Sequence, residues 1–296
     1  MDVNSHKDPS IMVDLFSKIS LDAEYFSVRR IQMEGRKVEL PTPPIRASIH
    51  CFVFITGGET LVTIGEETYC FKANECASIP AGQVFSVRYF DNTTGFMGRF
   101  NDEFLNSNID GKNVIGSFSI LRRWGTHKVC FDAEHSKYIG DIFERLYVES
   151  SSKKNKNIIR AYLTTLLTEI EEIHQPNSDA PIQTENDICN KYIELVFKCS
   201  KHDVSLSEYA AQLNITQNYL SKIVKRFTGK TPLAWITEAV VLDAKVSLCQ
   251  TAMTTSEIAF SVGIDDPSYF ARLFKKQTGY TPQEYREKKK SQECPL

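Results

Sequence analysis

The residues Gly229-Lys230-Thr231 are of the types that end a phosphate-binding loop, in which backbone N–H groups, a lysine and a hydroxyl hold a nucleotide. The complete motif requires another glycine five residues before Gly229, and Val224 stands there. The preceding residues also lack the pattern of a strand, which such a loop must follow. The sequence therefore does not support nucleotide binding at this position.

Cysteine and histidine could support metal or covalent chemistry, but their spacing argues against both. No two cysteines form a Cys-x-x-Cys pair, and neither His-x-His nor His-Glu-x-x-His occurs. We expect reduced, buried thiols in a cytosolic protein, with no catalytic residue, no metal and no cofactor. The eight cysteines are at positions 51, 70, 76, 130, 189, 199, 249 and 294.

The bulk composition is that of an ordinary soluble globular protein. The chain has 296 residues, 42% hydrophobic and 24% charged, which is long enough for two domains. Its net charge of −2 gives no global sign of a nucleic-acid partner, so a basic patch must be local. Neither a signal peptide nor a membrane-spanning stretch is evident, and we expect a cytoplasmic protein with no membrane partner.

The first part of the chain has a residue pattern typical of β proteins. Short segments dense in β-branched and aromatic residues are separated by turn formers such as "TGGE" and "PAG". This pattern predicts a sandwich or small barrel, with a short helix at 100–107. The expected strands are 26–33, 48–56, 59–65 and 84–90.

A helical period follows, from about 134 to 174, with a break near "SSSKKNKN". The two apolar stripes either pack within the chain or form a dimer interface, and the pattern leaves both open. Their members are Tyr138, Ile142 and Leu146, then Ile159, Leu163, Leu166, Leu167 and Ile170. Two prolines and no hydrophobic period mark a linker at 175–183. We therefore expect domains at 1–174 and 184–296.

The last 113 residues are helical in pattern and contain a duplication. The string "KRFTGKTP" (225–232) returns as "KKQTGYTP" (275–282), and Glu208 and Ala210 return as Glu257 and Ala259. Each copy predicts a helix, a tight turn and a second helix, which is the helix-turn-helix unit. The helix from Pro232 to about Cys249 would separate the units by about 27 Å, close to the repeat of successive major-groove faces.

The stretch "SEIAFSVGIDDPSYFARLFKKQTGYTPQEYR" (256–286) resembles the signature of AraC/XylS-type transcriptional regulators. The resemblance extends over about 100 residues, from Ile188 to Arg286. More loosely, "GGETLVTIG" and "IPAGQVFSV" resemble the cupin-like sensor barrel that many such regulators carry. Together the two resemblances imply an α+β two-domain protein. An N-terminal cupin-like β-barrel with flanking helices would be followed by an all-α double helix-turn-helix domain.

The resemblance also implies which residues contact DNA. Pro267 departs from the family pattern. Its side chain has no hydrogen-bond donor and cannot recognise a base edge, so the second unit should contribute little to DNA sequence specificity. The side chains expected to contact bases are Asn218, Ser221, Lys222, Ser268 and Arg272, and those expected to contact phosphates are Lys225, Arg226, Lys275 and Lys276. The aromatic and apolar residues Tyr219, Leu220, Tyr269, Phe270 and Phe274 are expected in the core.

The barrel is expected to sense a ligand and not to catalyse. A cupin enzyme holds metal with a His-x-His pair and a later histidine, whereas the first strand here offers only His50 and Phe85 stands at the later position. His127 and His135 lie outside the barrel pattern. The polar groups that could bind an effector in the barrel interior are Arg46, His50, Arg88 and Arg99. The alternatives are a barrel that binds no ligand and only dimerises, a cupin enzyme fused to a DNA-binding tail, and a repair alkyltransferase.

Together these observations predict a bacterial transcription regulator. It would bind double-stranded promoter DNA as a homodimer, respond to a small-molecule effector, and contact RNA polymerase if it activates transcription.

Overall fold

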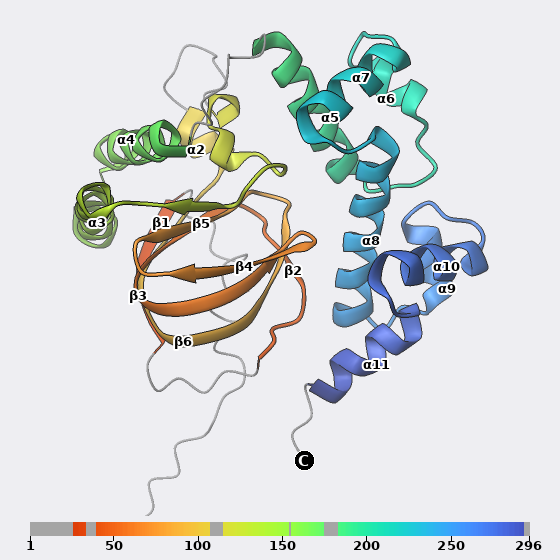
Figure 1. The fold of residues 1–296 in the computed structure, drawn as a ribbon, viewed down its shortest axis with the longest axis horizontal. Coiled ribbons are helices and arrows are strands. Elements are labelled where there is room, and N and C mark those ends of the chain that lie inside the picture. The colour runs from red at the N-terminus through yellow and green to blue at the C-terminus, as the bar shows by residue number, and fades with distance from the viewer. Residues whose placement is uncertain (1–25, 34–39, 107–114, 154, 175–182, 293–296) are drawn as a thin grey trace, which may run out of the picture.

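The computed structural model describes residues 26–33, 40–106, 115–153, 155–174 and 183–292. A strongly bent antiparallel sheet with helices on one side forms the first part, and a long helix, α8, forms the axis of the second, helical part (Figure 1). The expected linker, 175–183, falls outside the described residues except for Gln183, which begins a helix. Within the described part of the chain no helix is both long enough and apolar enough to cross a membrane.

The sheet has seven strands in the order β1-β6-β3-β5-β7, with β2 paired to β6 and β4 paired to β3. Among the described residues no pairing joins β1 to β7, so the expected barrel is a sheet that curls without closing. The strands are β1 Phe26–Gln32, β2 Ile45–Arg46, β3 His50–Ile64, β4 Glu67–Lys72, β5 Glu75–Ile79, β6 Val84–Phe100 and β7 Lys128–Cys130.

Two long strands, β3 and β6, bend sharply and belong to both halves of the sheet. The first half of β3 pairs with β5, its second half pairs with β4, and β6 follows it throughout with register shifts near Gly57. Gly95 permits the bend, because a Cβ there would lie 2.0 Å from the backbone oxygen of Phe54. The prediction of separate strands at 48–56 and 59–65 is therefore wrong. The "TGGE" segment is a bend inside one strand, not a turn between two.

Helices cover one face of the sheet. The buried face of α3 is formed by Ile139, Phe143 and Leu146, so the expectation is confirmed for Leu146. It is wrong for Tyr138, which is 49% exposed, and Ile142 is only half-buried. The apolar stripe of α4 is fully buried in the same core as the sheet. Packing within the chain thus accounts for both stripes. The elements are α2 Asp102–Asn106, η2 Ile115–Ser117, η3 Ser119–Leu121, α3 Ala133–Val148, the π-helical turn Glu149–Lys153 and α4 Lys156–His174.

The helical domain has two cores that share α8. Trp235, Ile236 and Ala239 belong to the first core, and Val241 and Leu248 belong to the second. A helix that is apolar on most of its circumference must be buried on several sides, which α8 achieves by lying between the two units. The helices are α5 Gln183–Cys199, α6 Leu206–Gln212, α7 Gln217–Thr228, α8 Pro232–Gln250, α9 Thr255–Ser261, α10 Pro267–Thr278 and α11 Pro282–Gln292.

Candidate nucleic-acid interface

The first helix of each unit starts with the same hydrogen-bonded cap. Ser205 and Glu208 exchange bonds at the start of α6, and Thr254 and Glu257 do so at the start of α9. Each cap satisfies two backbone N–H groups that a helix start leaves unpaired. The backbone donors also hold the pKa of both glutamates below their usual range. The duplication is thus repeated in local hydrogen bonding as well as in sequence.

Positive backbone φ angles fix the turns and the ends of the second helices. The inter-helix turns contain Asn214 at φ 55° and Gly263 at φ 73°, and α7 and α10 end at Gly229 and Gly279 in the left-handed conformation. Asparagine and glycine adopt this conformation more easily than other residues do. The chain direction is therefore set at equivalent points in both units.

The lysine of the Gly-Lys-Thr stretch has partners within the protein, and its side chain is 42% exposed. Lys230 Nζ lies 2.7 Å from Glu238 Oε2 and 4.7 Å from the ring centre of Trp235. Thr231 caps α8 by accepting a hydrogen bond from the backbone N–H of Ala234. Both residues thus organise the start of α8, which explains their identities without a nucleotide.

The second helices, α7 and α10, each bury one face and expose the other. Leu220, Ile223 and Val224 of α7 and Phe270 and Phe274 of α10 are buried. Among the residues expected to contact bases, Ser221 is half-buried, and the exposed ones are Asn218, Lys222, Ser268 and Arg272.

Two of the aromatic residues expected in the core are not buried. Tyr219 is 40% exposed and Tyr269 is 39% exposed, so the prediction is wrong for both. Each lies one position before a buried residue of its helix, at the edge between the packed face and the open face. Their hydroxyls reach outside their own helices, Tyr219 to Glu185 at 3.0 Å and Tyr269 to His202 at 3.5 Å.

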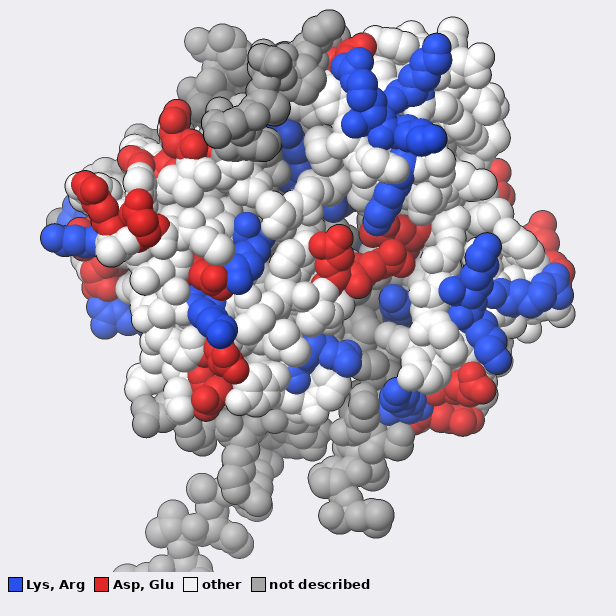
Figure 2. Space-filling model, viewed as in Figure 1, with Lys and Arg blue, Asp and Glu red and all other residues white. Residues whose placement is uncertain are grey.

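Basic side chains gather over both units. Figure 2 shows two separate groups of Lys and Arg on the visible face of the helical domain, with acidic side chains between them. The lysines expected to contact phosphates, Lys225, Lys275 and Lys276, are all exposed at the last turn of their helix. This arrangement places positive charge at the same end of each recognition helix.

Two of the expected DNA contacts already have carboxylate partners. Arg226 forms an ion pair with Glu185 of α5, which also accepts the hydrogen bond from Tyr219. Arg272 Nη2 lies 3.9 Å from Oδ2 of Asp266, the N-cap residue of α10, the helix that contains Arg272. The contact between Arg226 and Glu185 could not be predicted from the sequence, because 41 residues separate the partners.

The structure does not bring the four expected effector-binding residues together. Arg46 donates to Gly82 O at 2.7 Å and pairs with Asp243 of α8, and His50 is bonded to Asp102. Arg88 is exposed at a separate cleft, beside Tyr285 of α11. Arg99 is buried and donates to Ser27 Oγ at 3.4 Å.

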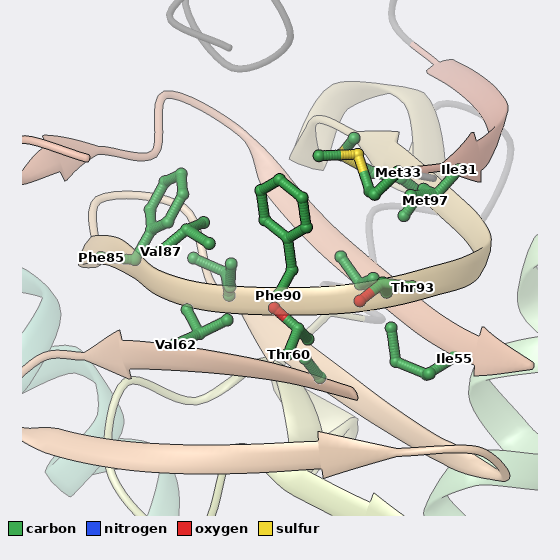
Figure 3. A pocket seen from close by; sticks show the side chains of 13 residues that line it. Ile31, Met33, Ile55, Thr60, Val62, Phe85, Val87, Phe90, Thr93 and Met97 are labelled. Carbon is green, nitrogen blue, oxygen red and sulfur yellow. The ribbon is translucent and has the colours of Figure 1, made fainter. Parts of the chain in front are cut away.

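The interior of the sheet is apolar and small. Its cavity measures about 50 Å³ and is lined by aliphatic and aromatic side chains of β1, β3, β5 and β6 (Figure 3). The hydroxyls of Thr60 and Thr93, which face it, both donate to backbone carbonyl groups. Among the described residues, none of the four predicted polar groups lines this cavity, so their predicted place in the barrel interior is wrong.

Among the residues the structure describes, no group of three or more His, Cys, Asp or Glu side chains could hold a metal ion. Cys51 and Cys76 are buried, and burial raises the pKa of the Cys51 thiol to about 12. A thiol with so high a pKa is a poor nucleophile at neutral pH.

Two helix-turn-helix units on a common axial helix, joined to a sheet domain, define a DNA-binding transcription regulator. A family model described as a helix-turn-helix domain matches residues 209–288. The HTH-type regulator YisR of Bacillus subtilis, itself uncharacterised, is 32% identical over 256 residues, covering 81% of this chain and 86% of YisR. The chain belongs to the AraC/XylS family of transcriptional regulators.

Two further relatives are regulators of sugar operons. The lactose operon transcription activator of Staphylococcus xylosus is 22% identical over 236 residues, covering 76% of this chain and 82% of its own. The arabinose operon regulatory protein of Escherichia coli is 26% identical over 161 residues, which are 52% of this chain and 53% of its own. Among solved structures, ToxT from Vibrio cholerae is similar over 89% of this chain and 98% of its own, with a TM-score of 0.49 and 13% identity.

Proposed function

We propose that α7 and α10 contact promoter DNA in successive major grooves. Asn218, Ser221 and Lys222 contact bases in the first groove, and Ser268 and Arg272 do so in the second. The observation that carries the proposal is the exposure of equivalent faces on two helices whose opposite faces are packed against α8 and its neighbours. An exposed helix face of polar and basic side chains matches what the major groove accepts.

The length of α8 supports simultaneous contact with both grooves. It has 19 residues, which corresponds to about 28 Å of helix. The spacing of successive major-groove faces is about 34 Å. The lateral offset of each recognition helix from the ends of α8 supplies the difference.

The two units contribute differently. Pro267 occupies the first position of α10, and Arg272 is drawn toward Asp266, so the second unit has fewer free donors for base edges. Lys225, Lys275 and Lys276, with Arg226, supply phosphate contacts, which add affinity and salt dependence without sequence choice. Most of the sequence preference therefore comes from the first unit.

The test is a titration of promoter DNA from the region of the protein's own gene. Lys222→Ala should weaken specific binding about tenfold or more, since a good contact to a base contributes about 1–3 kcal/mol. Arg272→Ala should have a smaller effect. Lys137→Ala, which removes an exposed lysine from α3, is the matched control and should leave binding unchanged. Unchanged specific binding in both α7 and α10 variants would show that the assigned contacts are wrong.

The proposal extends to the rest of the molecule. Residues 1–174 would serve sensing and dimerisation, and residues 184–296 would bind DNA in the cytoplasm, with RNA polymerase as partner if the protein activates. The names of two relatives associate them with sugar operons, which agrees with control by a small metabolite. No catalytic step is proposed.

A second candidate is a sheet domain that holds no ligand in its interior. The cavity of about 50 Å³ favours it, because ligand sites usually measure about 300–1,000 Å³. Under this candidate the sheet domain only dimerises. Unchanged thermal midpoints across a panel of sugars and organic acids would support it, since a ligand that binds the native state raises the midpoint.

A further inference from the structure

We propose that the cleft between the sheet domain and α5 binds a small organic anion with an apolar body, and that this anion couples the two domains. The inference rests on the proposed control by an effector and moves the site from the sheet interior to the domain boundary. The cleft is named here the α5 cleft. Its walls are Arg46, His50 and Arg123 on the sheet side and Asn190, Glu194 and Phe197 on α5.

The α5 cleft has the size that the sheet interior lacks. It measures about 570 Å³, compared with about 50 Å³ for the cavity inside the sheet. Sites for small molecules usually measure about 300–1,000 Å³. A metabolite therefore fits the α5 cleft without rearrangement of the sheet core.

Half-buried and exposed cationic side chains line the cleft, and protein groups only partly satisfy them. Arg46, Arg122, Arg123 and Lys198 line it, against the carboxylates of Asp102 and Glu194. Arg123 Nε donates to Ala81 O at 2.8 Å, but its Nη1, like Arg122 Nε, is buried without a hydrogen-bond partner among the described residues. Buried donors without partners are costly, and since neither nitrogen has accessible surface, a small rotation of each guanidinium toward an oxyanion in the cleft would supply the missing acceptors.

Asp102 does not neutralise these arginines through a direct contact. Its Oδ1 accepts a hydrogen bond from His50 Nε2 at 2.8 Å, and the backbone N–H of Ala81 donates to His50 Nδ1 at 3.2 Å. Since Nδ1 accepts, the histidine proton lies on Nε2 and points to Asp102. This bond is the first cause of the lowered pKa of Asp102. The chain Ala81–His50–Asp102 is closed, so it offers no acceptor to the unpartnered nitrogens Arg122 Nε and Arg123 Nη1.

Gly82 brings the Arg123 guanidinium against the backbone. A Cβ at Gly82 would lie 2.1 Å from Arg123 Nη2, so only a glycine admits the arginine there. On its other side the guanidinium lies 5.2 Å from the ring centre of Phe197. Arg123 is thus held in place from both domains, which is how a preformed anion site is positioned.

The remaining wall of the α5 cleft is apolar, and it determines what kind of group the ligand must carry besides its anion. Phe118 and Leu121 face the cleft from the η2–η3 segment, and Ile193 and Phe197 face it from α5. A fully hydrated ion such as inorganic phosphate would leave this wall uncovered. The occupant should therefore join a carboxylate, phosphate or sulfonate to an apolar body.

Occupancy would affect DNA binding through α5. This helix packs against α7 in the first core, and its Glu185 holds Arg226 of the recognition helix. Trp124 Nε1 already donates to Asn190 Oδ1 at 2.8 Å across the same boundary. An anion that binds both walls favours the arrangement seen here over any in which α5 separates from the sheet domain.

The experiment compares two fluorescent probes that differ in charge. 1-Anilinonaphthalene-8-sulfonate carries the anion and the apolar body, and N-phenyl-1-naphthylamine lacks the sulfonate. The full-length protein should bind the sulfonate at one saturable site at least tenfold more tightly than the neutral probe. Equal affinity for both probes would overturn the proposal.

Variants then locate the site. Arg123→Gln should weaken sulfonate binding about tenfold, and Lys198→Gln, at an exposed position on the rim, should weaken it about threefold without risk to folding. Arg88→Gln is the matched control, because Arg88 lines the other cleft, and it should have no effect. The assignment of the site to the α5 cleft would be refuted if Lys198→Gln bound the sulfonate with wild-type affinity and either Arg123→Gln or Arg122→Gln did so too. Displacement by phenylacetate or by phenyl phosphate would distinguish a carboxylate ligand from a phosphate one.

A last measurement separates this inference from the proposed function. Lys222→Ala should lose specific DNA binding yet bind the sulfonate normally. In wild type, saturating sulfonate should change the Kd for DNA at least threefold, and in Arg123→Gln it should not. A bound probe that leaves the wild-type Kd unchanged would refute the coupling of the domains.

Discussion

At the scale of single residues, carboxylates next to the recognition helices limit the positive charge available to DNA. Glu185 is the clearest case, since its side chain is 13% exposed and holds Arg226, which is 58% exposed. The same carboxylate raises the pKa of Tyr219 through its hydrogen bond. Arg226 must therefore give up a protein partner before it can contact a phosphate.

Glu185→Gln should release Arg226 and strengthen DNA binding about two- to fivefold, the range expected for loss of one exposed ion pair. If Arg226 then contacts a phosphate, the slope of log K against log salt should steepen by about 0.9. Titrations at several salt concentrations measure both effects. Asp187→Asn makes the same charge change at an exposed position two residues along α5 and is the control. Equal slopes in the two variants would contradict the role given to Glu185.

At the scale of secondary-structure elements, the helical domain and the sheet depend on different kinds of information. The helices begin and end at local signals, such as Ser205 with Glu208 at the start of α6 and Gly229 at the end of α7. The sheet depends on the bend of β3 against β6, where Gly95 passes the backbone of Phe54. A single methyl group at that point would force the two strands apart.

Gly95→Ala should destabilise the protein by about 2–3 kcal/mol, because the added Cβ would lie 2.0 Å from a backbone oxygen that cannot move aside. Gly140→Ala is the contrast: its Cβ would lie 3.7 Å from the Phe54 ring, and alanine favours the helix by up to about 1 kcal/mol. Urea unfolding of both variants measures the difference. Equal stability of the two proteins would show that the bend does not need glycine.

At the scale of the whole molecule, the sheet domain and α8 are joined by a small set of polar contacts. Arg46 pairs with Asp243, and Gln250 Nε2 donates to Pro44 O at 2.8 Å. Burial lowers the pKa of Arg46 to about 10, so it stays charged at neutral pH. Both contacts fasten the segment around β2 to the axial helix of the DNA-binding domain.

Asp243→Asn should loosen this junction without unfolding either domain. The pair is only partly buried, so the loss of stability should be under about 1 kcal/mol. Hydrogen exchange should quicken at the amide of Ala47, which is bonded to Gln83 O at 2.8 Å next to the pair. Asp265→Asn, at an exposed position in the second unit, should leave that exchange rate unchanged. Unaltered exchange in Asp243→Asn would show that other contacts hold the junction.

The sequence alone determined the helix-turn-helix duplication and its family. Its signals are local: Thr231 and Pro232 start α8, and Gly279 ends α10, because caps and left-handed residues act within one helical turn. The exposed positions of Lys222 and Arg272 followed from the helical period around buried Leu220 and Phe270.

Only the tertiary structure decided where the remaining polar groups lie. Arg46 faces Asp243 from 197 residues away, and Arg226 faces Glu185 from 41 residues away, distances over which no periodicity carries information. The bend of β3 likewise depends on which strand lies beside Gly95. Helices are specified by neighbours in the chain, whereas strand pairing and domain contact are specified by neighbours in space. For this reason the exposed faces of α7 and α10 could be derived from the sequence, and the α5 cleft could not.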